Sequence, residues 1–187
     1  MDSRAAKPTA SAGPVRTLVL GGARSGKSEI AENIVARHGA GVTYVATCIG
    51  AGEGEKGWRA RIEAHRRRRP AAWRTVEVPA GGDLSAVLVS LDGPLIIDSL
   101  GTWLAGLDGF RADVDRLCAA LTERDSPAVI VSDEVGLGVH PASSAGMEFR
   151  DALGELNRRV GMVCDEVILV VAGRAMSLPA SRPGEAL

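Results

Sequence analysis

Residues 15–28 read Val15-Arg-Thr-Leu-Val-Leu-Gly-Gly-Ala-Arg-Ser-Gly-Lys-Ser28. The apolar first half predicts a buried strand, because it is short and rich in aliphatic side chains. The strand runs directly into Gly21-x-x-x-x-Gly26-Lys27-Ser28, the pattern of a loop that binds nucleotide phosphates. The residues that follow have apolar side chains at helical spacing, so a helix is expected to begin near Lys27.

The residue types explain why such a loop binds phosphate. Gly21, Gly22 and Gly26 lack Cβ atoms, so backbone N–H groups can approach an anion closely. The helix N-terminus adds its dipole. Lys27 is expected to reach the β- and γ-phosphates, and Ser28 to place its hydroxyl on Mg²⁺. A plain Gly/Ser turn is the alternative, and the ordered succession of strand, glycines, Lys-Ser and amphipathic helix disfavours it.

The composition fits one α/β domain of a globular protein. The chain has 187 residues, of which 45% are hydrophobic and 24% charged, and its net charge is -1. These values exclude wholesale disorder and give no global field for binding nucleic acid. Three cysteines without Cys-x-x-Cys spacing favour a reducing, cytoplasmic setting. We find no apolar run long enough for a membrane span.

The pattern along the chain predicts a mostly parallel sheet flanked by helices on both faces. Short apolar runs alternate with helical periodicity, which is typical of that architecture. We expect a flexible extension over 1–14, a single phosphate-loop domain over 15–175 and an irregular tail over 176–187. The strongest helical pattern covers Met147 to Val163. The five predicted strands are Thr17–Leu20, Val42–Ala46, Leu95–Ile97, Ala128–Val131 and Val167–Val171.

Carboxylates follow two of these strands. Asp98 ends Pro94-Leu-Ile-Ile-Asp98, the expected position for an acidic residue that helps to hold Mg²⁺ opposite the phosphate loop. Its alternative role is to cap the helix that starts near Ser99. Glu134 follows the strand at 128–131, where it could equally face a substrate or cap a turn. The match of Asp98-x-x-Gly101 to regulatory GTPases is weak, because the chain has no Asn-Lys-x-Asp element.

A strongly basic segment lies at Trp58-Arg-Ala-Arg-Ile-Glu-Ala-His-Arg-Arg-Arg-Arg-Pro70. In a helix, Arg61, His65 and Arg68 or Arg69 would share one face. Neighbouring cations disfavour protonation of His65, so a neutral imidazole could act as a nucleophile, and the arginines could bind polyphosphate. A solvated basic helix with an incidental histidine is the alternative. A nucleic-acid surface is disfavoured, because aromatic residues are not interleaved with the arginines.

Several motifs in order resemble the bifunctional adenosylcobinamide kinase/adenosylcobinamide-phosphate guanylyltransferases. The resemblance covers residues 16–173 approximately, and it is specific because the phosphate loop and the Arg-Ile-x-x-His block occur together. The motifs are Gly21-Gly-Ala-Arg-Ser-Gly-Lys-Ser28, Tyr44-Val-Ala-Thr47, Arg61-Ile-x-x-His65, Arg69-Pro-x-x-Trp-Arg-Thr-x-Glu77, Ile97-Asp-Ser-Leu-Gly-Thr-Trp-Leu104 and Ser132-Asp-Glu-Val-Gly-Leu-Gly138.

The resemblance implies a P-loop, RecA-like fold and two reactions of cobalamin biosynthesis. ATP or GTP phosphorylates the aminopropanol hydroxyl of adenosylcobinamide, and GTP then donates GMP to that phosphate. In the second reaction His65, at the matching position, would carry GMP covalently while pyrophosphate leaves. By the same resemblance the chain forms a homo-oligomer, commonly a trimer.

The resemblance also implies a set of nucleotide-binding residues. Ser28 and Asp98 would in addition hold Mg²⁺. The implied nucleotide-binding residues are Gly21, Gly22, Ala23, Arg24, Ser25, Gly26, Lys27, Ser28, Ala46, Thr47, Cys48, Arg66, Arg67, Arg68, Arg69, Glu77 and Asp98.

The chain departs from the family pattern in three places. Four consecutive arginines follow His65, Cys48 stands where a small hydroxyl residue is common, and the C-terminal end is irregular. Two other functions remain open from the residues alone: a small-molecule kinase without a covalent step, and a nucleotide-dependent binding protein. A base for the kinase step is not evident from the sequence.

Overall fold

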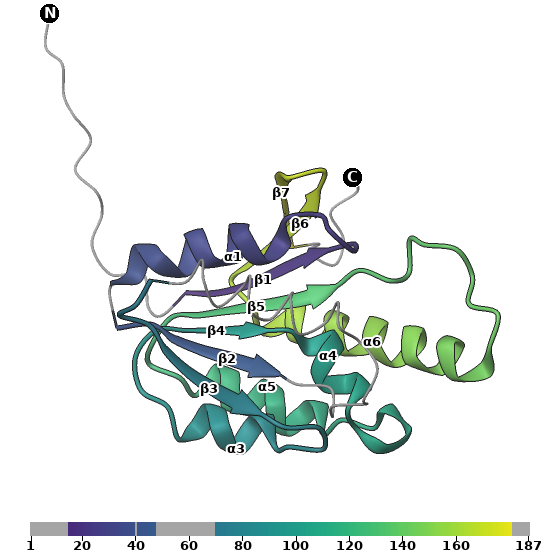
Figure 1. Cartoon of the computed structure of the whole chain (residues 1–187), viewed down its shortest axis with the longest axis horizontal. Coiled ribbons are helices and arrows are strands. Elements are labelled where there is room, and N and C mark those ends of the chain that lie inside the picture. The colour runs from purple at the N-terminus through teal and green to yellow at the C-terminus, as the bar shows by residue number, and fades with distance from the viewer. Residues whose placement is uncertain (1–14, 40, 48–69, 181–187) are drawn as a thin grey trace, which may run out of the picture.

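The computed structural model describes residues 15–39, 41–47 and 70–180. Within them seven strands form one sheet in the order β3-β2-β4-β5-β1-β6-β7, and every neighbouring pair is parallel except β6 with β7 (Figure 1). The strands are β1 (Arg16–Gly21), β2 (Thr43–Thr47), β3 (Arg74–Val78), β4 (Leu95–Asp98), β5 (Ala128–Asp133), β6 (Glu166–Val171) and β7 (Arg174–Leu178).

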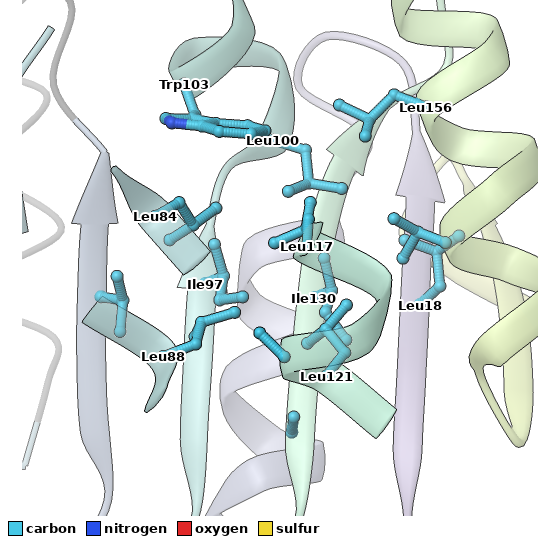
Figure 2. Packing of buried hydrophobic residues seen from close by; sticks show 14 of the residues in the cluster. Leu18, Leu84, Leu88, Ile97, Leu100, Trp103, Leu117, Leu121, Ile130 and Leu156 are labelled. Carbon is cyan, nitrogen blue, oxygen red and sulfur yellow. The ribbon is translucent and has the colours of Figure 1, made fainter. Parts of the chain in front are cut away.

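Helices cover both faces of the sheet, as the sequence predicts. Helix α1 packs on one face of the sheet, in a hydrophobic cluster that includes Val19 of β1 (Figure 1). The other described α-helices pack on the opposite face, in a cluster that includes Leu18 and Leu20 of the same strand. Figure 2 shows this larger core, with Ile97 and Ile130 of the sheet beneath α3 and α5. The α-helices are α1 (Lys27–Val35), α3 (Leu84–Val89), α4 (Leu100–Ala105), α5 (Val114–Thr122) and α6 (Ser144–Val163), and the 3₁₀ helices are η1 (Ala36–His38) and η2 (Asp108–Phe110).

All five predicted strands are present, with bounds within a few residues of the apolar runs. The predicted helix at 147–163 begins earlier, at Ser144, because the Ser143 side chain accepts a hydrogen bond from the Gly146 N–H and caps it. The described part of the chain contains no helix that is long and apolar enough to cross a membrane. Of the cysteines described, Cys118 and Cys164 are free thiols, and burial raises the pKa of Cys164 to about 12.

The prediction of an irregular tail from residue 176 is wrong at its start, where strand β7 lies. Residues 176–178, expected to be irregular, pair antiparallel with β6. The two strands join through Ala172 and Gly173, whose φ angles of 51° and 74° suit a tight hairpin turn. The sequence hides this strand because all of its side chains are exposed, so no burial pattern marks it.

Candidate active site

The phosphate loop connects β1 to α1 in the predicted way. Helix α1 begins at Lys27, and Gly26 precedes it with φ 93° and ψ 6°, a left-handed conformation that glycine adopts without strain. Arg24 also has a positive φ, of 58°. The Ser25 N–H donates to the Gly22 carbonyl at 3.3 Å, which closes the turn. The loop backbone therefore curves around the N-terminus of α1, the arrangement that binds anions.

Two neighbouring strands hold this loop in place. The Gly173 N–H, in the β6–β7 turn, donates to the Ser25 carbonyl at 2.8 Å. The Glu134 N–H, just after β5, donates to the Gly21 carbonyl at 3.1 Å. A Cβ on Gly21 would lie 2.8 Å from the Val170 carbonyl oxygen, which is backbone and has little freedom to move. Position 21 therefore has space for glycine but not for a residue with a Cβ atom.

This packing predicts the effect of replacing either of the two adjacent glycines. Gly21→Ala is expected to lower the free energy of unfolding by about 1–3 kcal/mol, because the added methyl group overpacks the loop. Gly22→Ala is the matched control, since a Cβ there meets nothing within 4 Å, and it should change stability by less than about 0.5 kcal/mol. Urea denaturation of both variants checks this. Equal stabilities would contradict the close approach of Gly21 to Val170.

Lys27 contacts a carboxylate that ends the neighbouring strand. Its Nζ atom lies 2.8 Å from Oδ1 of Asp133 and donates to the Gly22 carbonyl at 3.3 Å. The Lys27 side chain is 13% exposed and that of Asp133 is 32% exposed, so solvent reaches the acid more than the amine. Asp133 ends strand β5 and Lys27 begins helix α1, which packs on the sheet. The ion pair therefore holds the ammonium group at the mouth of the loop.

Three of the residues expected to contact nucleotide lie side by side across the sheet. Ala46 of β2 is in register with Glu77 of β3 on one side and with Asp98 of β4 on the other. Side chains alternate along a strand, so Asp98 lies on the same face as Ile96, which packs in the cluster with α1. The structure therefore brings these residues together on the face that α1 covers.

Asp98 does not cap a helix, which removes its alternative role. The N-cap of α4 is Ser99, whose side chain accepts from the Thr102 N–H. Oδ2 of Asp98 instead accepts a hydrogen bond from the Tyr44 hydroxyl at 2.5 Å. Tyr44 is almost completely buried, so this bond fixes the carboxylate at the end of β4.

Thr47 supports the same turn. Its hydroxyl donates to the Ser99 carbonyl at 2.8 Å and accepts from the Ser99 N–H at 2.9 Å. The one proton of the Thr47 hydroxyl is thereby used by the chain that follows Asp98, so this side chain does not donate to a phosphate in this arrangement. Glu134 acts as a turn cap, since its Oε1 accepts from the Gly136 N–H at 2.7 Å.

Two oxygen donors at this edge of the sheet fit Mg²⁺. The Ser28 hydroxyl and the Asp98 carboxylate offer the oxygen ligands that this ion prefers, and Mg²⁺ commonly uses one or two protein groups together with substrate phosphates. Among the described residues, no group of three or more His, Cys, Asp or Glu side chains could hold a metal ion by itself. A Mg²⁺ ion held by Ser28 and Asp98 would need phosphate oxygens of a bound nucleotide as further ligands.

Some of the predicted site residues fall outside the described part of the chain: Cys48, His65, Arg66, Arg67, Arg68 and Arg69. Sequence analysis assigns no role to Asp133, although Asp133 and Glu134 both follow the apolar run at 128–131. The signal that points to Asp133 is spatial. Strand β5 lies beside β1, and Asp133 is in register with Gly21. The local sequence of neither strand indicates that the two are neighbours in the sheet.

A family model described as cobinamide kinase / cobinamide phosphate guanyltransferase matches residues 17–178. The chain belongs to this family. It is therefore a transferase with kinase and guanyltransferase activities that uses nucleotides, and the predictions of family, bifunctional activity and P-loop fold are confirmed. The match includes the phosphate loop, Asp98 and the strand that ends in Asp133.

Two bacterial proteins are similar over nearly their whole length. The bifunctional adenosylcobalamin biosynthesis protein CobP of Pseudomonas aeruginosa is 42% identical over 173 residues, covering 88% of this chain and 97% of the relative. The protein of the same description named CobU, from Escherichia coli, is 32% identical over 176 residues, covering 83% and 95%. Among solved structures, the flagellar accessory protein FlaH from Methanocaldococcus jannaschii is 14% identical, with a TM-score of 0.49 over 87% of this chain and 75% of that one.

Proposed function

We propose that this family member acts on adenosylcobinamide in two steps and that in the second step a histidine carries GMP from GTP to the substrate phosphate. In the first step, ATP or GTP bound on Gly21–Ser28 gives its γ-phosphoryl group to the hydroxyl of the aminopropanol arm. In the second, a nitrogen of His65 attacks the α-phosphorus of GTP, an N–P bond forms and pyrophosphate leaves. The substrate phosphate then displaces the histidine, which gives adenosylcobinamide-GDP.

The observation that carries this proposal is that the phosphate loop and the row formed by Glu77, Ala46 and Asp98 follow parallel strands and so lie along the same carboxyl edge of one sheet. Lys27 lies at the mouth of the loop, where a cation favours polyphosphate. Mg²⁺ would be held by Ser28 and Asp98 and would neutralise charge on the phosphates. The four arginines that follow His65 would add further positive charge. A homotrimer and a cytoplasmic location stay predictions.

Labelled nucleotide tests the covalent step. Incubation with GTP labelled at the α-phosphate is expected to label the protein, whereas GTP labelled at the γ-phosphate is not. The adduct should be labile in acid and stable in alkali, as phosphorus–nitrogen bonds to histidine are, and cobinamide phosphate should discharge it. Kinase activity without any such adduct would favour the alternative, a small-molecule kinase that has no covalent step.

A further inference from the structure

Asp133 lies at the phosphate loop and forms an ion pair with its lysine. Its Oδ1 atom contacts Lys27 at 2.8 Å, and lysines at this position of a phosphate loop bind the β- and γ-phosphates. Asp133 is in register with Gly21, the first residue of the loop. The Asp133 carboxylate is one-third exposed, so a substrate can reach it.

The backbone around Asp133 is fixed on both sides. The Asn157 amide of α6 donates to the Asp133 carbonyl at 3.0 Å, and the next residue, Glu134, donates its N–H to Gly21. Helix α4 leaves room for the carboxylate through Gly101, where a Cβ would collide with Oδ2 of Asp133. The backbone that carries the carboxylate is therefore fixed beside the loop, and the carboxylate itself is held by its ion pair with Lys27.

The other described carboxylates at this edge are placed less well for chemistry at the γ-phosphorus. Asp98 lies on β4, two strands from β1, so that ~10 Å separates the two strand backbones, and its proposed role is to hold Mg²⁺. Its Oδ2 is also engaged by Tyr44. Glu134 folds back on the Gly136 N–H. Glu77 lies on β3, four strands from β1. Asp133 is the described carboxylate that contacts the loop lysine.

We infer that Asp133 is the proton acceptor of the kinase step, an inference that rests on the proposed function. The substrate hydroxyl attacks the γ-phosphorus, the new P–O bond forms, and the bond to the leaving nucleoside diphosphate breaks. The hydroxyl proton passes to the Asp133 carboxylate, which releases it to solvent after product leaves. A carboxylate suffices, because kinases position such a group to accept the hydroxyl proton of the attacking substrate. The guanylyl step needs no such base, because its acceptor is a phosphate that is already ionised.

Measuring the kinase reaction and the guanylyl transfer separately therefore distinguishes this role from a merely structural one. Asp133→Asn keeps the side-chain shape and is expected to lower kcat of cobinamide phosphorylation at least ~100-fold, the usual contribution of a general base. Formation of the guanylyl adduct from GTP, and its discharge by cobinamide phosphate, should stay within about fivefold of wild type. Glu134→Gln is the matched control and should keep both reactions, since that side chain caps a turn.

Two results would overturn the inference. One is a wild-type kinase rate in Asp133→Asn. The other is an equal fall of both half-reactions together with weaker GTP binding, which would make Asp133 only a support for Lys27. Gly101→Ala gives a second test, because it retains the acid but displaces it: kinase kcat should fall while GTP binding stays. A wild-type protein that phosphorylates no cobinamide would instead refute the proposed function itself.

Discussion

Lys27→Met is expected to weaken GTP binding by about 10–100-fold and to lower both transferase activities by about 10²–10³-fold. Methionine keeps much of the apolar stem of the side chain and removes the ammonium group. That group lies at the mouth of the loop, 13% exposed and 2.8 Å from a carboxylate. A cation with so little access to water interacts strongly with phosphate, because solvent screens it poorly.

Equilibrium binding of GTP and steady-state rates of both half-reactions measure this effect. One complication is that Lys27→Met leaves Asp133 without its partner, and an unpaired carboxylate beside the loop repels the nucleotide. The double variant Lys27→Met/Asp133→Asn removes that repulsion. If the double variant binds GTP as wild type does, the lysine is not what binds the phosphates. If it binds as weakly as Lys27→Met, the loss belongs to the ammonium group.

The phosphate loop could be predicted in detail because its chemistry is local. Glycines, lysine and serine at fixed spacing determine the turn, and α1 begins at the expected Lys27. The buried strands were also predictable, since continuous apolar runs are typical of a parallel sheet covered on both faces. Strands β3 and β7 gave weaker signals. Both carry mostly exposed side chains, so their position depends on backbone pairing with β2 and β6 rather than on burial.

The partners of the site residues could not be predicted, for a related reason. Contacts such as Tyr44 with Asp98 and Lys27 with Asp133 join segments that are 54 and 106 positions apart in the chain. They follow from the strand order, which places β5 between β4 and β1. Capping was open for a different reason: Asp98 and Ser99 are adjacent and both residue types cap helices well. Only the structure assigns the cap to Ser99.

His65→Ala is expected to abolish guanylyl transfer while phosphorylation of cobinamide continues. Without the imidazole no N–P bond can form, so the α-labelled adduct should disappear and transfer of GMP should fall by about 10³-fold or more. The kinase step uses the γ-phosphorus and needs no covalent carrier. Its rate should therefore stay within a few-fold of wild type, with unchanged melting temperature as the check on folding.

His38→Ala is the matched control for this variant. His38 is exposed in η1, ~16 Å along the helical segment from Lys27, so it lies at the opposite end of α1 from the phosphate loop. Its replacement should leave adduct, transfer and kinase activity unchanged. A His65→Ala protein that still forms the acid-labile adduct would move the covalent role to another residue. Loss of both reactions in a folded protein would mean that the kinase step also depends on His65, and that the two reactions share more than the phosphate loop.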